Sequence, residues 1–378
     1  RRVRLQRWIP FDDEPIALEL IARVRPDAPD EVAIEIRDLG NAVRPGNPDP
    51  PAVVGTVLLG KRYPEPPPPE AFPLTNEGSC RFTPHQLYDG ERRLFHGPLF
   101  AALDSTDRQG DEGIEGHLRV LPHSGLFRST AAPDLILDPL LIDASTHLLS
   151  SWHLGQPDQN GRVVLPYELG NVTLYGPRPA VGTRLKCRVR VENGSARQVS
   201  HRIDLIGPDD RLWCRLAPAE YWRFYWPLEY VDFFRHKERF LLAKDWPTCS
   251  QEDVRVMRLD PPSDLCQPVH RTALARVTLS RREWSIFRLL KEDERRLTDW
   301  LFGRIAAKDA VRALWHARHG QRLFPADIEL EAGEDGRAAT HYRGRALVEE
   351  LPRVAFACVP GTCAAAAAFG QDVHLTLQ

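Results

Sequence analysis

Three basic side chains recur every four residues in one strongly helical segment: Arg304, Lys308 and Arg312. Residues spaced by four lie on one face of an α-helix, so these cations are expected to share a face. Asp309 stands beside that face. This combination suits a metal-bound pyrophosphate, because the carboxylate can bind the cation while the basic groups bind the phosphates. The alternative is a charged helix face that points into solvent.

A second pair with chemical potential lies in the middle of the chain. Asp143 and His147 are four residues apart, in a segment that offers Asp138 as an N-cap and Pro139 at the first helical position. Both side chains therefore project from one face of a helix predicted over residues 138–152. The alternative for the aspartate is a charge favoured by the helix dipole near the N-terminus. The alternative for the histidine is an interior side chain with satisfied hydrogen bonds.

Composition and charge indicate a soluble globular protein of two or three domains. The chain has 378 residues, of which 42% are hydrophobic and 27% charged, and its formal net charge is −2. This charge gives no reason to expect nucleic acid or a membrane as a partner, and no apolar run is long enough to span a bilayer.

Seven scattered cysteines form no Cys-x-x-Cys pair and no zinc-binding spacing. We therefore expect reduced thiols, no structural metal and a cytoplasmic location. Cys358 and Cys363 are expected to be buried structural residues. The chain opens at Arg1 without a signal peptide and enters strand-like sequence at once, so we expect a segment of a longer polypeptide.

Short alternating runs over residues 1–83 predict antiparallel strands, for example at 16–24 and 32–36. The proline-rich run at 64–69 must be extended and predicts a stiff linker. A second β-rich unit over residues 84–235 surrounds the helix at 138–152. Two such halves, each able to wrap one helix, fit a double hot-dog fold, in which an antiparallel sheet wraps a central helix.

The remainder of the chain predicts a linker and an α+β unit. Residues 236–270 are rich in proline and are expected to be the linker. Helical periodicity then extends over residues 281–317, and strand-like sequence resumes at residue 327. The last unit is therefore predicted to be α+β over residues 271–378.

Three motifs in the first two units resemble those of polyketide synthase dehydratases in their order and spacing. Residues 95–100 (FHGPLF) resemble the Tyr-Gly-Pro-x-Phe motif, and residues 140–147 (LLIDASTH) resemble the Asp-x-x-x-Gln/His helix. Leu165-Pro166 and the strand after it also match the family's layout. The resemblance covers most of residues 1–230 and implies a double hot-dog dehydratase that is truncated at its N-terminus.

The resemblance implies elimination of water from a β-hydroxyacyl thioester by acid–base chemistry that needs no cofactor. Asp143 takes the role of the acid, and His147 orients it or binds the substrate hydroxyl. The substrate tunnel is expected to include His96, Gly97, Pro98, Phe100 and Pro166. The implied partners are an acyl carrier protein with a phosphopantetheine-tethered acyl chain and the other synthase domains, in a homodimer.

The family's general base is a histidine in a His-x-x-x-Gly-x-x-x-x-Pro motif, which does not occur in this sequence. Either that motif lies upstream of Arg1, or the first half lacks its base. His96 is not expected to replace the base.

The string GRIAAKDAVR at residues 303–312 resembles the lysine–acid helix of 4′-phosphopantetheinyl transferases. Residues 324–329 and the turn signal Asp335-Gly336 resemble the strand and turn that follow it. The resemblance implies that Asp309 binds Mg²⁺. It also implies that coenzyme A phosphates lie on the three basic residues named above.

The end of the chain departs from the transferase pattern. Ala355 and Cys358 replace a serine and a histidine, and Thr376 and Gln378 replace an aspartate and a glutamate. A magnesium site with one carboxylate is weak, so we expect a degenerate, inactive domain. A shifted alignment would place Asp372 at the metal position instead.

Three hypotheses therefore stand at the level of sequence. The first is a dehydratase region that acts on carrier-bound acyl chains. The second is a pair of inactive domains that dock the carrier protein or hold the synthase together. The third is an active, magnesium-dependent transferase that primes the synthase itself.

Overall fold

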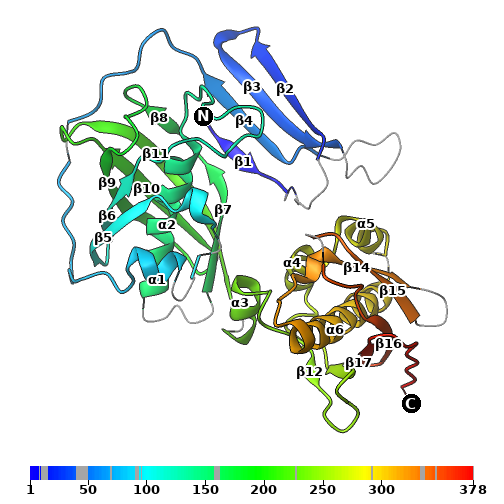
Figure 1. The fold of residues 1–378 in the computed structure, drawn as a ribbon. Helices are drawn as coiled ribbons and strands as arrows, with labels where there is room; N and C mark the ends of the chain where they lie inside the picture. Colours follow the sequence, from blue (N-terminus) through cyan, green and yellow to red (C-terminus); the bar gives the residue numbers. More distant parts are fainter. Residues whose placement is uncertain are drawn as a thin grey trace. The chain divides into compact units, whose positions relative to one another are not determined.

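The computed structural model describes the chain except for residues 8, 10–15, 40–49, 69, 90–92, 95, 157–161, 226–227, 291–292, 333–336, 345–346 and 378. The chain divides into two compact units (Figure 1). The first comprises residues 1–8, 19–37 and 51–228, and the second comprises residues 9–18, 38–50 and 229–378.

An eleven-stranded antiparallel sheet forms most of the first unit, in the order β2-β3-β4-β1-β7-β11-β10-β9-β6-β5, with β8 paired to β11. The predicted strands near residues 18, 32, 162, 185 and 202 are all present. The strands are β1 (Val3–Leu5), β2 (Leu18–Arg25), β3 (Ala28–Asp38), β4 (Val53–Leu58), β5 (Leu103–Gly110), β6 (Gly113–Arg119), β7 (Arg162–Leu169), β8 (Val172–Leu174), β9 (Arg184–Gly194), β10 (Gln198–Ile206) and β11 (Leu212–Tyr225).

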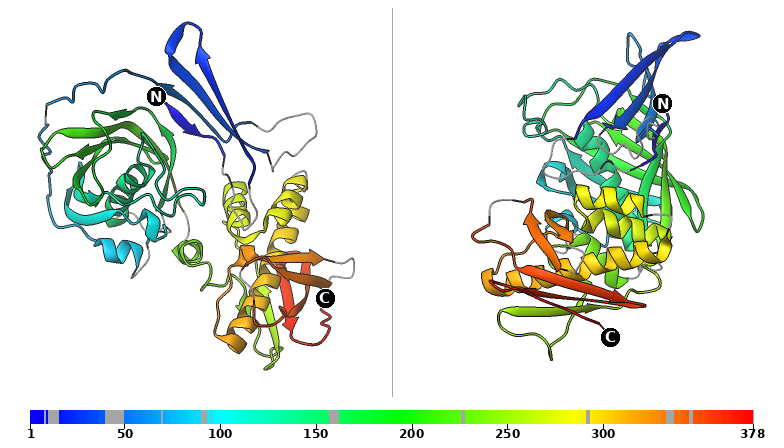
Figure 2. Two further views of the ribbon diagram at one scale, coloured as in Figure 1. Left: turned by 45° about the horizontal axis from the view of Figure 1, so that its top comes forward. Right: turned by 90° about the vertical axis from the view of Figure 1, so that its right-hand side faces the viewer.

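Helix α2 (Pro139–Gly155) lies inside the curve of this sheet (Figure 2). Its start is as predicted: the Asp138 side chain accepts the N–H groups of Leu140 and Leu141, and Pro139 is at the first helical position. Leu141 and Leu148 of the helix pack with residues of β6, β9 and β10 in one buried core. Each fully buried leucine contributes about 1.5–3 kcal/mol, so the apolar face of α2 fixes its depth in the sheet.

The N-terminal strands differ from the predicted first hot-dog half, because the described part of residues 1–83 contains no helix. On β2, Leu20 and Val24 are 66% and 61% exposed. Ion pairs such as Arg4–Glu168, at 2.5 Å, join β1 to β7. Strands β1–β4 therefore extend the sheet that wraps α2 and do not enclose a helix of their own within the described residues.

The described part of the proline-rich run, residues 64–68, forms no helix or strand, and the chain continues into a segment attached to the sheet. Glu70 pairs with Arg202 at 2.7 Å and with Arg215 at 3.3 Å. The Phe72 ring is buried, and the Arg190 guanidinium lies 4.8 Å from its centroid. These contacts fasten the segment that follows the predicted linker to strands β9, β10 and β11.

The second unit is a six-stranded antiparallel sheet, in the order β12-β13-β17-β16-β15-β14, with helices packed on it. Its strands are β12 (Lys244–Asp245), β13 (Val254–Leu259), β14 (Ile328–Ala332), β15 (Arg337–Tyr342), β16 (Arg353–Val359) and β17 (Thr362–Ala368). Its helices are α3 (Leu228–Arg235), α4 (Pro268–Thr278), α5 (Arg281–Leu289) and α6 (Glu294–His319).

The prediction of a linker over residues 236–270 is wrong, because β12 and β13 lie in that range. Strand β13 pairs with β17 along its whole length, from Val254 opposite Ala368 to Leu259 opposite Cys363. The prediction took the prolines of this range as evidence against strands. They lie outside β13, so the N–H groups of that strand remain available for pairing. The α+β unit therefore begins well before residue 271.

The predicted helix over residues 281–317 is two helices, with Asp293 capping the start of α6. Helix α6 crosses β16 at Gly303, where an added Cβ would lie only 3.0 Å from Cys358 Sγ and 3.1 Å from Phe356 Cδ2. Strands β14 and β15 pair as an antiparallel hairpin, as predicted. Its turn, Asp335-Gly336, lies outside the described residues.

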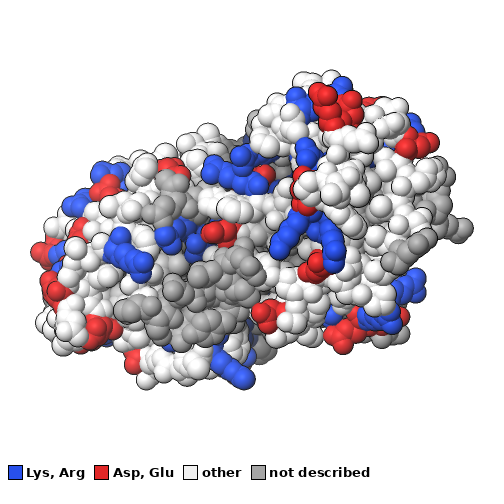
Figure 3. Space-filling model, turned by 90° about the horizontal axis from the view of Figure 1, so that it is seen from below, with Lys and Arg blue, Asp and Glu red and all other residues white. Residues whose placement is uncertain are grey.

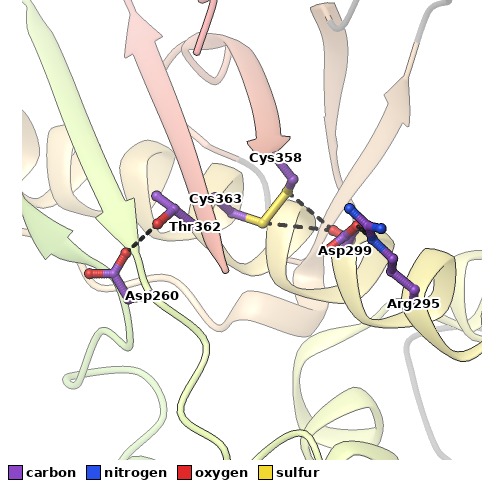
Figure 4. Close-up of a disulfide and its surroundings, with 6 residues drawn as sticks. All are labelled: Asp260, Arg295, Asp299, Cys358, Thr362 and Cys363. Carbon is purple, nitrogen blue, oxygen red and sulfur yellow. Dashed lines mark hydrogen bonds and ion pairs between the residues drawn. A yellow bond between two sulfur atoms is a disulfide. The ribbon is translucent and has the colours of Figure 1, made fainter. Parts of the chain in front are cut away.

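Cys358 and Cys363 form a disulfide, contrary to the expectation of reduced thiols (Figure 4). The two cysteines face each other across the hairpin of β16 and β17. Directly opposed residues of an antiparallel pair bring their Cβ atoms together, and a spacing of five residues gave no warning of this pairing. The other five cysteines are free.

None of the described helices is both long and apolar enough to cross a membrane. On the face of the molecule in Figure 3, basic and acidic side chains are interspersed among the described residues. This mixture agrees with the formal net charge of −2.

Candidate functional site

Helix α2 and the loop before the short helix η2 (Pro98–Phe100) bring together His96, Asp143 and His147. One nitrogen or carboxylate oxygen from each side chain lies within 4.8 Å of the others. His147 Nε2 is 3.0 Å from Asp143 Oδ2, and His96 Nε2 is 3.5 Å from the same oxygen. The predicted pair on the helix is thus confirmed as neighbours, and His96 joins them from a distant part of the sequence.

The three groups differ in their access to solvent. The His147 side chain is 1% exposed, whereas that of Asp143 is 34% exposed. The carboxylate can therefore meet a reactant while the histidine behind it remains inside the core. Tyr88, at the end of α1 (Pro84–Tyr88), contacts His147 Nδ1 through its hydroxyl at 2.7 Å. Tyr88 belongs to none of the sequence motifs.

His96 is a neutral imidazole at physiological pH. Its side chain is 16% exposed, and its ring lies 3.8 Å from the His147 ring, centroid to centroid. Burial, reinforced by the neighbouring His147, lowers the pKa of His96 to about 4, although the nearby Asp143 opposes the shift. A neutral imidazole has a lone pair that can accept a proton, and the lowered pKa makes His96 a weaker base than a free histidine.

The other predicted tunnel residues have different surroundings. Gly97 is the N-cap of η2, and both it and Pro98 are exposed. Phe100 is half-buried at the end of η2, and Pro166 is exposed in β7 opposite Tyr221. Gly97, Pro98 and Phe100 adjoin the cluster through the chain, whereas Pro166 is not part of it. The tunnel itself stays a prediction.

The cluster is also the one group of described His, Cys, Asp and Glu residues close enough together to hold a metal ion. Asp309, the predicted magnesium ligand, is in no such group among the described residues. Its Oδ2 accepts the N–H groups of Leu242 and Ala243 at 2.8 and 3.0 Å, and its Oδ1 accepts from Arg312 at 2.7 Å. These partners occupy both oxygens of the carboxylate. The site does not fit Mg²⁺.

The three basic residues of α6 are buried, so they form neither a phosphate site nor a solvent-exposed face. Lys308 is 0% exposed, and its Nζ donates to Glu283 Oε2 at 2.6 Å and to Thr278 O at 2.7 Å. Arg304 lies over the Trp300 ring at 3.8 Å and beside Glu283. Arg312 donates to Leu323 O at 2.9 Å.

The internal partners of these cations come from α4, α5, α6 itself, Leu323 and the segment before β12. Burial lowers the pKa of Lys308, and the Glu283 carboxylate opposes this shift. The geometry is that of an ion-pair network inside the second unit, and the predicted coenzyme A site is wrong. At the end of the chain, Asp372 pairs with Arg353.

A second pair of histidines lies deeper in the first unit. His153 at the end of α2 and His201 on β10 approach each other at 3.1 Å between their Nε2 atoms. Burial lowers the pKa of His201 to about 3, from a reference value of 6.5. Because protons bind the unfolded chain more readily, the stability that His201 contributes is complete above pH 6.5. It is lost as the pH falls toward 3.

We expect the free energy of unfolding to fall by about 1.4 kcal/mol per pH unit below pH 6.5 for His201, with a similar share from His96 down to about pH 4. Urea unfolding across this range measures the slope. His201→Gln should flatten it, whereas His85→Gln, at an exposed position, should leave it unchanged. Equal stability across the range would contradict the burial of a neutral His201.

Comparison with known proteins places the cluster in a family context. Residues 68–219 match the model of the family described as "Polyketide synthase dehydratase N-terminal domain", and all three cluster residues lie within this span. No curated protein matches the chain. The family match supports a polyketide synthase dehydratase domain in the first unit. It ends before the second unit, whose transferase resemblance gains no support.

Solved structures similar to the chain include dehydratase domains from three bacteria. One is a trans-AT polyketide synthase dehydratase domain from Brevibacillus brevis, at 18% identity over 59% of this chain and 75% of that chain, with a TM-score of 0.44. The dehydratase domain of PpsC from Mycobacterium tuberculosis, in complex with C12:1-CoA, has 16% identity over 59% and 74%, with a TM-score of 0.43. The dehydratase domain of RzxB from Pseudomonas fluorescens has 16% identity over 58% and 74%, with a TM-score of 0.42.

Proposed function

We propose that the first unit eliminates water from a β-hydroxyacyl chain tethered to an acyl carrier protein, with Asp143 as the acid and His96 as the base. The carrying observation is the approach of His96 Nε2 to Asp143 Oδ2 at 3.5 Å. The match of residues 68–219 to the dehydratase family supports the reaction class. A proton donor and a proton acceptor on one small surface are what an elimination requires.

The proposed reaction requires a neutral His96 as the proton acceptor and the acid form of Asp143 as the proton donor. His96 Nε2 takes the proton from the α-carbon of the thioester, and the electron pair left on that carbon forms the α,β double bond. The bond between the β-carbon and the hydroxyl oxygen breaks, and Asp143 gives its proton to the departing oxygen, which leaves as water. The proton on His96 then returns to the Asp143 carboxylate, and both groups regain their starting states.

His96→Gln should lower the rate of water elimination by at least about 100-fold, since general acid–base catalysis contributes about 10²–10⁴-fold. The rate is measured by intact mass of a carrier protein loaded with a β-hydroxyacyl group. The matched control is His85→Gln, which removes an exposed imidazole from α1 and should leave the rate unchanged. A His96→Gln protein as fast as the wild type would place the base elsewhere.

The non-catalytic alternative predicts a different pattern in the same assay. A first unit that only docks the carrier protein would bind the loaded carrier, and the acyl chain would keep its hydroxyl group with the wild type and with every variant.

A further inference from the structure

The buried Tyr88 hydroxyl lies between strand β5 and the cluster of His96, Asp143 and His147, and it contacts both. The backbone N–H of Leu103, at the start of β5, donates to the Tyr88 hydroxyl oxygen at 3.4 Å. The same oxygen is 2.7 Å from His147 Nδ1. Tyr88 is 8% exposed, and its ring meets that of His147 edge to face at 5.6 Å between centroids.

The direction of these hydrogen bonds follows from the donors available. The Leu103 N–H can only donate, so the Tyr88 oxygen accepts there. Among the described residues His147 Nδ1 is the one acceptor within reach of the Tyr88 hydrogen, and a buried hydroxyl without an acceptor is costly, so that hydrogen is directed to Nδ1. Burial raises the pKa of Tyr88, which keeps that hydrogen in place. A neutral imidazole has one N–H, so an accepting Nδ1 puts the proton on Nε2. His147 Nε2 lies 3.0 Å from Asp143 Oδ2.

We propose that Tyr88 is a positioning residue that fixes His147 in the Nε2–H tautomer, so that the nitrogen 3.0 Å from Asp143 Oδ2 carries the proton. His147 then has no free lone pair with which to remove a substrate proton. The two histidines of the cluster are thereby separated in role: His147 orients the acid, and His96 accepts the proton. The tautomer stands independently of the proposed dehydration, and only its catalytic consequence rests on that function.

The full chain labelled with ¹⁵N-histidine tests the tautomer by NMR, with the His147 signals assigned by their loss in His147→Gln. We expect a pyridine-type signal for Nδ1 and a pyrrole-type signal for Nε2 in the wild type. Tyr88→Phe should move both signals toward the average of the two tautomers. Tyr63→Phe, at an exposed position, should move neither.

The spectrum of the wild type decides the question even if Tyr88→Phe fails to fold. A pyrrole-type signal from both nitrogens of His147 would mean an imidazolium, and an Nδ1–H tautomer would reverse the hydrogen bond; either result overturns the proposal. So does a Tyr88→Phe spectrum identical to that of the wild type.

The rate of dehydration gives a second test of the proposed role of Tyr88. Tyr88→Phe should lower kcat for dehydration by about tenfold or more with little change in KM, because loss of the correct tautomer misdirects a catalytic group without removing it. An unchanged kcat would show that the tautomer of His147 does not affect dehydration. If the wild type shows the Nε2–H tautomer but eliminates no water, the proposed role of Tyr88 in fixing the tautomer stands and the proposed function is refuted.

Discussion

Asp143→Asn should reduce water elimination by about 10²–10⁴-fold while leaving the fold intact. Asparagine matches aspartate in size but cannot give a proton to the departing hydroxyl. The side chain is 34% exposed and does not cap its helix, since the N-cap of α2 is Asp138. Its replacement therefore removes little packing. Intact mass of the loaded carrier protein measures the rate, and thermal unfolding checks the fold.

The matched control is Asp134→Asn, which makes the same chemical change at an exposed position outside the cluster. It should eliminate water at the wild-type rate. Wild-type turnover by Asp143→Asn would end the assignment of this residue as the acid. A large fall in melting temperature would instead reveal a structural role for the carboxylate.

Lys308→Met should destabilise the second unit by about 3–5 kcal/mol. The substitution keeps a long apolar stem but leaves the Glu283 carboxylate, which is 1% exposed, without its 2.6 Å partner. A buried charge that loses its partner retains the cost of its removal from water. Urea unfolding of the full chain, followed by a signal from the second unit, measures the loss.

The control for this substitution is Lys244→Met on β12, where the side chain is exposed and a change within about 0.5 kcal/mol is expected. The transferase hypothesis predicts the opposite pattern for Lys308→Met: weaker binding of coenzyme A with Mg²⁺ and unchanged stability. That outcome would restore a phosphate site on α6.

Features of the cluster of His96, Asp143 and His147 that depend on local sequence could be predicted. The N-cap Asp138 and the following proline fixed the start of α2, and a spacing of four then placed Asp143 and His147 on one face. These inferences hold because capping and helical periodicity act over a few residues.

Contacts between distant segments could not be predicted. His96 reaches Asp143 from a loop, and Tyr88 reaches His147 across 59 positions of sequence. Neither contact has a periodic signature. The Phe-His-Gly-Pro string was a signal for His96, but its imidazole fills a place where the related motif has a tyrosine. Tyr88 carried no signal beyond a capping box around its short helix.

The charged residues of α6 also show what local sequence cannot predict. Their spacing was read correctly as one face, but spacing does not tell whether a face meets solvent, a ligand or the protein interior. Glu283 on α5 and the backbone N–H groups of Leu242 and Ala243 supply the partners. These come from segments 25 and 67 positions away. Because the three basic residues of α6 are buried against these partners, they form an internal ion-pair network and not a phosphate site.

The most direct test of the account is the intact mass of a β-hydroxyacyl-loaded carrier protein after incubation with the wild-type chain. The account predicts loss of one water molecule from the acyl chain, because it assigns His96 as the base and Asp143 as the acid, 3.5 Å apart. A carrier protein that binds the chain and keeps its full mass would contradict the assignment of His96 as the base and Asp143 as the acid.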